Sequence, residues 1–266
     1  MRAVDGGNAM YSQLVVFSQC AAGRDDEFND WYTWVHIRDV MRLSPVVMAA
    51  QRFERAAAQL EPGGPARYPQ KYLAIYETTD PVRMTQDHRP VFTEDMPISS
   101  AYAFEDICEA YYDTVASRGP SFAHTPRAAV IVEQIEIVSN AAGFVDWYLD
   151  SRLPALTRLP GMLSGCLGSA ASHQMFDGPH PQYTALYRTA DLARSVAGWR
   201  DYSAATPVRE ELRDSSAVCY TPLIDRLTAI EVAQPSAQAR DIAGRKRGNL
   251  GDRVHRGAPG FTGFQS

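Results

Sequence analysis

The sequence predicts an α+β protein made of two consecutive copies of a β-α-β-β-α-β unit. The first observation is a helical signature, FNDWY at 28–32, whose Phe, Asp, Trp and Tyr recur at identical spacing in FVDWY at 144–148. The second is a strand-like segment, YLAIYETTD at 72–80, which returns as YTALYRTAD at 183–191. Because both landmarks recur in the same order, we expect one repeat at 11–114 and another at 127–230.

Each expected element of the first repeat has a local reason. Val, Leu and Phe are dense at 11–19, as in strands, and the acidic pair Asp25-Asp26 suits the first turn of a helix. Asp80-Pro81 is typical of a helix start, with Asp as the cap and Pro in the first turn. The expected order is a strand at 11–19, a helix at 26–43, strands at 46–55 and 71–78, a helix from Asp80-Pro81 and a strand at 104–114.

The second repeat has the same expected order of strands and helices. Its expected elements are a strand at 128–138, a helix at 143–159, a strand at 162–169, the strand-like segment at 183–191, a helix at 191–202 and a strand at 217–223. Loops rich in Pro and Gly are expected at 60–70 and 171–182. This order is the ferredoxin-like plan, which puts both helices on one face of the sheet. The other face must be covered, so we expect the two repeats to curl together around a central space.

Residues 233–266 differ in character from both repeats. The segment is polar and glycine-rich, and its cations outnumber its acidic residues. One interpretation is a solvated tail. The other is an arm that wraps a neighbouring subunit of a homodimer or closes over a cavity. The cations are too few, and too poor in interleaved aromatic residues, to predict a nucleic-acid-binding arm.

Composition narrows the class of protein. The chain has 266 residues, a net charge of −5 and a pI near 5.7, which argue against nucleic acid as a partner. Its four cysteines are scattered, so free thiols are expected rather than a disulfide framework or a zinc site. We find no apolar run long enough to span a bilayer and no signal peptide, and we expect a cytoplasmic protein without membrane contact.

Cofactor motifs are absent from the sequence. Neither GxGxxG nor GxxxxGK occurs, so a nucleotide cofactor is not expected. No GxSxG elbow, HxH or HExxH pattern occurs either. We therefore expect a protein without metal or organic cofactor.

The two signatures differ at one ionisable position. His36 of the first repeat falls opposite Arg152 of the second. A neutral imidazole can accept or donate a proton near pH 7, whereas a guanidinium can bind an oxyanion through paired hydrogen bonds. The structural alternatives are a histidine bonded to a backbone carbonyl or to Asp39, and an arginine paired with Asp146 or Asp150. We expect His36 and Arg152 to act as the catalytic pair, in a cleft of the first repeat that the second repeat completes.

Five tyrosines are candidate substrate-binding residues. Tyr72 and Tyr76 share one face of their strand, and Tyr183 and Tyr187 share the equivalent face of theirs. Tyr32 lies beside His36 on the helix. If these faces line a pocket, the hydroxyl groups could donate to a phenolic or keto substrate; the alternative is core packing.

The signature Phe28, Trp31-Tyr32, His36, Leu43 and Pro45 resembles the EthD-like branch of the dimeric α/β-barrel superfamily. The resemblance covers both repeats but not the tail. It implies that the two repeats form an intramolecular α/β-barrel pseudo-dimer. The second repeat departs from the pattern at Arg152, although it keeps a Leu-Pro-Gly turn at 159–161.

These features together predict a cofactor-independent lyase, isomerase or cyclase. Its substrate would be an apolar, aromatic or polyketide-like carbonyl compound on which His36 moves a proton. One alternative is a cofactor-free monooxygenase of a phenolic substrate. The other is a non-enzymatic ligand-binding or stress-associated barrel, which predicts a packed interior around His36.

Overall fold

The computed structural model describes residues 11–61, 69–88, 93–120, 124–176, 178, 180–207, 209 and 212–255. Parts of the two predicted loops, at 62–68 and at 177 and 179, lie outside the described residues. So does the end of the C-terminal segment, at 256–266.

Residues 12–118, here called the first half, have the predicted order of elements. A helical segment follows the first strand in three consecutive parts, because five residues in its middle adopt π-helical hydrogen bonding. The elements are β1 (Ser12–Cys20), α1 (Asp25–Trp31), η1 (Tyr32–His36), α2 (Ile37–Leu43), β2 (Val47–Arg55), β3 (Tyr72–Thr78), α3 (Pro81–His88) and β4 (Tyr102–Arg118).

Residues 129–222, the second half, repeat this order and include a π-helical segment at the equivalent place. Gly161, in the turn between the helical segment and the next strand, has a φ of 86°, a conformation that favours glycine. The elements are β5 (Ala129–Ile137), α4 (Ala141–Trp147), η3 (Tyr148–Arg152), α5 (Leu153–Thr157), β6 (Met162–Ala170), β7 (Tyr183–Thr189), α6 (Leu192–Ala205) and β8 (Leu212–Pro222).

The eight strands of the two halves form a closed antiparallel ring. Their order is β3-β1-β4-β6-β7-β5-β8-β2, and β2 also pairs with β3, which returns the ring to its start. Two seams join the halves, β4 with β6 and β8 with β2. Closure leaves none of these strands as a free edge. It also explains why β4 runs beyond the predicted end at residue 114: residues 114–118 pair with β6, a partner that local sequence cannot reveal.

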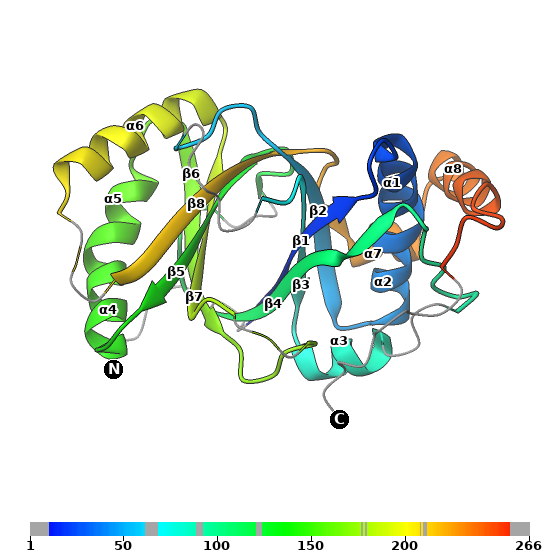
Figure 1. Cartoon of the computed structure of the whole chain (residues 1–266), viewed down its shortest axis with the longest axis horizontal. Coiled ribbons are helices and arrows are strands. Elements are labelled where there is room, and N and C mark those ends of the chain that lie inside the picture. The colour runs from blue at the N-terminus through cyan, green and yellow to red at the C-terminus, as the bar shows by residue number, and fades with distance from the viewer. Residues whose placement is uncertain are drawn as a thin grey trace.

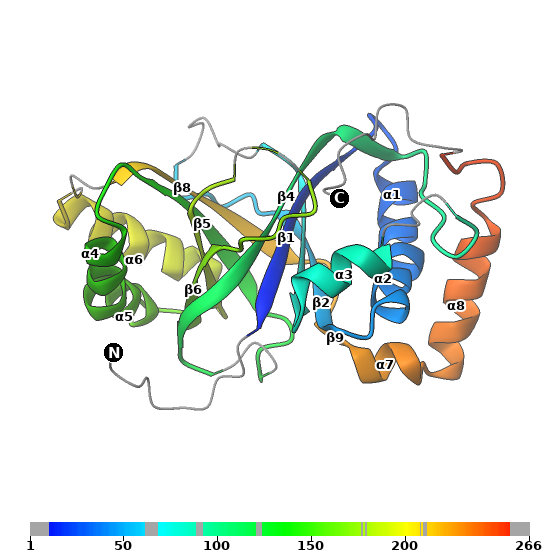
Figure 2. The same cartoon turned by 90° about the horizontal axis from the view of Figure 1, so that it is seen from below.

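Helices cover the barrel on two opposite sides (Figure 1). Those of the first half stand on one side and those of the second half on the other, with the strands between them (Figure 2). Alternation along each strand separates the two faces. Val15 and Phe17 of β1 fill the barrel interior, whereas Leu14 and Val16 face the helices.

The barrel interior is packed with side chains, so it is not the expected central space. Its apolar core comes from both halves, for example Leu73 and Leu186. Polar pairs are also buried there, such as Arg188, whose Nη1 donates to Gln51 Oε1 at 2.7 Å. The space for a ligand must therefore lie outside the barrel, between the helices and the strands.

Two glutamines join the halves in the same way. Gln59, in the loop after β2, exchanges two hydrogen bonds of 2.9 Å with the backbone of Cys219. Gln174, in the loop after β6, does the same with Tyr111, at 2.7 and 2.9 Å. Each glutamine thus fixes the loop of one half on the last strand of the other half.

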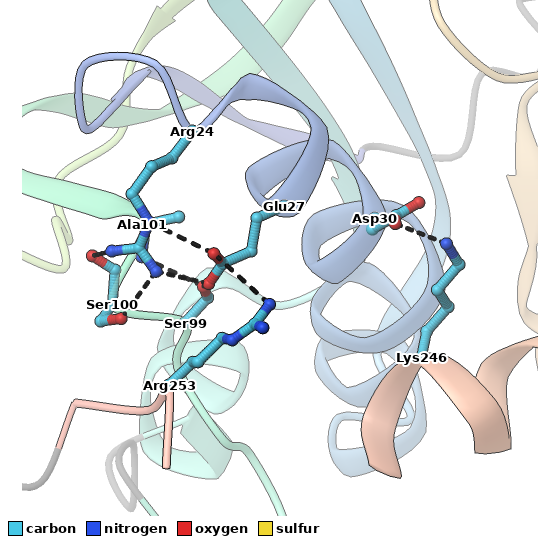
Figure 3. A network of polar contacts seen from close by, with 8 residues as sticks. All are labelled: Arg24, Glu27, Asp30, Ser99, Ser100, Ala101, Lys246 and Arg253. Carbon is cyan, nitrogen blue, oxygen red and sulfur yellow. Dashed lines mark hydrogen bonds and ion pairs between the residues drawn. The ribbon is translucent and has the colours of Figure 1, made fainter. Parts of the chain in front are cut away.

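The segment after β8 folds onto the first half as far as residue 255, and so differs from the expected solvated tail. It forms β9 (Leu227–Thr228), α7 (Ala229–Ala233) and α8 (Ala237–Gly248), and α8 packs against η1. Lys246 pairs with Asp30, and Arg253 lies 3.9 Å from Glu27, which Arg24 also binds (Figure 3). These ion pairs explain the order of a segment with so little apolar surface.

Neither half contains a helix that could cross a bilayer, as far as the described residues extend. All four cysteines lie in the described part, and all four are free thiols, as the sequence predicts.

Candidate active site

A cavity of about 80 Å³ lies between the helices and strands of the first half. Aliphatic, aromatic and methionine side chains form most of its wall. Met175 and Phe176, from the loop fixed by Gln174, supply part of the wall from the second half. We call it the His36 cavity. Its polar lining residues are Tyr32, His36, Tyr76, His88, Tyr102 and Glu109.

His36 ends the π-helical segment and lies at the cavity wall. Its ring stacks on Trp31 with centroids 4.7 Å apart and meets Tyr32 edge-on, also at 4.7 Å. Trp31 is fixed in turn, because its Nε1 donates to the carbonyl of Pro97 at 2.8 Å. Nδ1 of His36 is buried and has no hydrogen-bond partner among the described residues. Single-turn π-bulges occur often at functional sites.

The imidazole of His36 is neutral over the physiological range. Its pKa is lowered from 6.5 to about 3, mostly by burial and in part by the neighbouring His88 and Arg52. His88 itself is buried, its Nε2 lies 2.9 Å from the carbonyl of Val40, and burial lowers its pKa as well. A neutral imidazole with an unpartnered nitrogen is available to bind or accept a proton.

Two of the predicted tyrosines reach the cavity together. The hydroxyl of Tyr76 donates to that of Tyr32 at 3.1 Å, so the proton of Tyr32 is left for another acceptor. Burial raises the pKa of Tyr32 to about 12. Tyr32 is therefore a phenol that can donate a hydrogen bond, not a phenolate.

Glu109 is a site residue that the sequence-based prediction missed. It lies on β4 opposite Val16 of β1 and lines the cavity. Burial raises the pKa of its carboxyl group from 4.5 to about 8, and its Oε1 has no hydrogen-bond partner within the described part of the chain. The signal was present in the strand alternation, because Glu109 shares its face with the apolar Ile107 and Tyr111.

A buried cation stands behind Tyr32, outside the cavity lining. The guanidinium carbon of Arg52 lies 4.4 Å from the centre of the Tyr32 ring. Its N–H groups donate to neutral oxygens, Thr33 Oγ1 at 2.7 Å and Asn29 Oδ1 at 3.0 Å. Burial lowers the pKa of Arg52 to about 10, which still leaves it charged at neutral pH.

Arg152 does not join His36, contrary to the predicted catalytic pair. It lines a different cavity, of about 230 Å³, among the helices and strands of the second half. We call this the Arg152 cavity. The two cavities lie on opposite sides of the barrel, because the helices that carry the two residues do (Figure 1). The packed interior of the barrel lies between the two cavities and separates them.

Arg152 is engaged in a buried polar network. Its Nη2 donates to Glu133 Oε1 at 2.5 Å, and the hydroxyl of Tyr148 donates to Glu133 Oε2 at 2.7 Å. Tyr187 joins through its hydroxyl, 2.5 Å from that of Tyr148. Asp146 and Asp150, the structural partners considered for Arg152, are not its acceptors in these contacts.

The other three predicted tyrosines line neither cavity; one of them, Tyr187, belongs to the network of Arg152. Tyr72 donates to Asp25 Oδ1 at 2.5 Å and accepts from Asn29 Nδ2 at 3.2 Å. Tyr183 packs on Phe144, with ring centroids 4.9 Å apart. Core packing, the alternative weighed for the tyrosine pairs, describes Tyr72 and Tyr183.

Strand register relates the cavities position by position. Tyr76 lies opposite Leu14, and Tyr187 opposite Ile131, so Glu133 of β5 takes the place of Val16 of β1. By the same register Ala217 of β8 takes the place of Glu109. Each cavity thus has one buried carboxyl group, but on different strands.

Among the described residues, no group of three His, Cys, Asp or Glu side chains converges as a metal site would require.

Comparison with known proteins shows the fold. No family model and no curated protein matches the chain. A candidate monooxygenase from Fusobacterium nucleatum has a similar structure, with a TM-score of 0.51 at 11% identity over 82% of this chain and 95% of that one. An anthrone oxidase-like protein has a TM-score of 0.56 at 10% identity, over 86% of this chain and 98% of that one. At these identities the likeness shows the fold alone, an α+β barrel of this kind, and it agrees with the fold class expected from the sequence.

Proposed function

We propose that the His36 cavity is the active site of a cofactor-independent enzyme. It would move a proton on an apolar, aromatic or polyketide-like carbonyl compound, as a lyase, isomerase or cyclase. The observation that carries the proposal is that one largely apolar cavity is lined by both the neutral His36, with its unpartnered Nδ1, and Glu109, with its unpartnered Oε1. Buried polar groups normally have partners, so such groups are candidates for binding a substrate.

In this proposal His36 takes a proton from the carbon next to a substrate carbonyl. The imidazolium would be unstable alone in the cavity, but it forms together with the negative enolate oxygen, and the attraction between the two is strong where water is excluded. Tyr32 and the protonated Glu109 would donate hydrogen bonds to that oxygen. Arg52 would stabilise the same negative charge from behind the Tyr32 ring.

The size of the cavity points to the part of the substrate it holds. At about 80 Å³ it is smaller than the engineered 150 Å³ cavity that binds benzene, so even a single ring needs more space than the cavity has as it stands. Three of its wall residues are methionines, Met84, Met96 and Met175, whose side chains adapt readily to different shapes. We propose that a single-ring substrate binds after a small movement of these side chains, and a larger one after a greater movement.

We further propose that the chain is a tandem pair of ferredoxin-like repeats of the EthD-like branch, with the catalytic role kept in the first. The equal order of elements, the paired π-helical segments and the matched glutamines support a duplication. The replacement of His36 by Arg152 supports a single proton-transfer site.

The test is hydrogen exchange in heavy water, under argon, with phenylacetone as a one-ring probe and anthrone as a three-ring probe. Loss of the benzylic proton signal by NMR measures proton transfer directly. His36→Ala should slow the enzyme-dependent exchange at least ~100-fold. His124→Ala, which changes an exposed histidine outside the cavity, is the control and should leave the rate unchanged. Equal rates for the wild-type protein and His36→Ala would overturn the proposal.

A cofactor-free monooxygenase is a second candidate, since the two similar structures are described in terms of that chemistry. It shares the first step, because the carbanion made by His36 could then react with oxygen. With anthrone, one atom of O₂ would become the oxygen of a new carbonyl at the CH₂ carbon. The other atom would leave as water with the two hydrogens of that CH₂ group. Oxygen uptake in air, without added flavin or metal, distinguishes it from the lyase, isomerase or cyclase.

A further inference from the structure

We propose that the Arg152 cavity is a second ligand site, separate from the His36 cavity, and that it takes a small carboxylate with an apolar body. The cavity has a volume of about 230 Å³. Trp199, Ala217 and Leu60 give it an apolar surface, whereas Arg152 and Arg200 give it cations. A ligand that matches this lining must combine an apolar body with a hydrogen-bond acceptor.

Arg152 is held in one orientation at this cavity. Its guanidinium carbon lies 6.0, 5.8 and 5.7 Å from the ring centres of Trp147, Trp199 and Tyr202, and Glu133 accepts its Nη2. Among the residues that the structure describes, Glu133 is its hydrogen-bond acceptor, which leaves most of its five N–H groups for a ligand. A fixed planar guanidinium matches a carboxylate through two parallel hydrogen bonds.

Arg200 adds a second cation. Its Nε and Nη2 donate to the backbone carbonyls of Leu60 at 2.8 Å and Gln59 at 2.6 Å. Neutral carbonyls orient this guanidinium without cancelling its charge. Of the two carboxylates at the cavity, Glu133 is already paired with Arg152, and Glu61 is exposed, where solvent and salt screen it. The balance of charge therefore favours an anion between the two arginines.

The first half has the same backbone arrangement but different residues at the equivalent positions. There Val16, His36 and Glu109 occupy the places of Glu133, Arg152 and Ala217. Ala217 leaves open the space that the Glu109 carboxyl group fills in the His36 cavity. In the second half the buried acid lies on β5, where it pairs with Arg152, and not on β8, the equivalent of β4. The space at Ala217 and the cation on the helix both favour an anionic ligand.

Benzoate is a suitable probe, with benzyl alcohol as its uncharged analogue. Titration calorimetry should show saturable binding of benzoate to the wild-type chain, with a Kd of about 1 mM or lower. Benzyl alcohol should bind at least ~10-fold more weakly, because it cannot form the paired charged hydrogen bonds. Equal affinity for the two compounds, or no saturable binding of benzoate, would overturn the proposal.

Two variants locate the binding. The double variant E133V/R152H gives the second half the residues that the first half has at these two positions. Ala217→Glu places an acid on β8, at the position equivalent to Glu109 on β4. Each should weaken benzoate binding at least ~10-fold while circular dichroism shows an unchanged fold. His36→Ala is the matched change in the other cavity and should leave the affinity unchanged. Benzoate binding that is lost in His36→Ala, or kept in both second-half variants, would contradict the assignment. Because no turnover is measured, the outcome is independent of the proposed reaction.

Discussion

The two halves of the barrel have the same backbone plan but keep their buried ionisable groups in opposite ways. In the first half, His36 Nδ1 and Glu109 Oε1 have no hydrogen-bond partner among the described residues. Burial lowers the pKa of His36 and raises that of Glu109, so it favours the neutral form of both groups. In the second half Arg152 and Glu133 are partners in a buried ion pair at 2.5 Å. Isolated buried groups give up their charge, whereas paired ones keep it. The comparison teaches that the neutral cavity is suited to moving a proton and the charged one to holding a ligand.

The largest effect on stability is expected from breaking the ion pair of Arg152 and Glu133. Arg152→Gln leaves Glu133 buried without its cation, and removal of one partner of a buried pair costs about 3–5 kcal/mol of unfolding free energy. Urea denaturation measures the loss. Adding Glu133→Gln removes the orphaned charge and should recover more than half of it. A single variant as stable as the wild-type protein would show that the pair is not buried as described.

His36 should make the protein sensitive to acid. Its pKa is about 3 in the folded protein and 6.5 when exposed, so the unfolded chain binds an extra proton between these values. Stability is therefore lost as pH falls below 6.5, by about 2 kcal/mol at pH 4 after allowance for screening by solvent in the cavity. Denaturation at pH 7 and pH 4 should show this loss in the wild-type protein and a smaller one in His36→Phe. Identical pH dependence would mean that His36 is charged in the folded state.

Glu109 should have the reverse effect. Its pKa is raised from 4.5 to about 8, so the folded protein holds the proton that the unfolded chain releases. The stability it contributes is complete below pH 4.5 and is lost as pH rises toward 8, with a change of about 1–2 kcal/mol. Glu109→Gln should flatten this part of the stability curve. If Glu109 donates to the substrate, wild-type turnover should also fall above pH 8.

The two glutamines offer a smaller and matched test. Gln59→Ala and Gln174→Ala each remove two hydrogen bonds between the halves, and each should cost about 1–2 kcal/mol of stability. Their effects on function should differ, because Gln174 fixes the loop that carries Met175 and Phe176 to the His36 cavity. Gln174→Ala should raise KM for the phenylacetone exchange, whereas Gln59→Ala should not. Equal effects on KM would argue against a separate site in each half.

Local sequence pattern predicted the order of elements well. Strands expected at 71–78 and 128–138, for example, are observed at Tyr72–Thr78 and Ala129–Ile137. It did not predict features that depend on distant partners. The extension of β4 requires β6, and α8 requires the acidic residues of α1 and α2.

The candidate site was predicted in part, for a related reason. His36, Tyr32 and Tyr76 do meet at one cavity, because helix and strand periodicity already place them on facing surfaces. Arg152 was placed with His36 because a repeat does not reveal which faces of its copies meet. Glu109 could have been found from its strand face, but its partnership with His36 depends on how β4 lies beside β1.

The central claim is that chemistry belongs to the first half alone, and one pair of variants tests it most directly. Tyr32→Phe and Tyr148→Phe remove the equivalent hydroxyl group from each half. The exchange rate of phenylacetone in heavy water should fall about 10-fold or more in Tyr32→Phe, since a donor to the enolate oxygen is lost. In Tyr148→Phe it should stay within about 2-fold of wild type, while stability falls because Glu133 loses a hydrogen bond. A rate that falls in Tyr148→Phe and not in Tyr32→Phe would contradict the account.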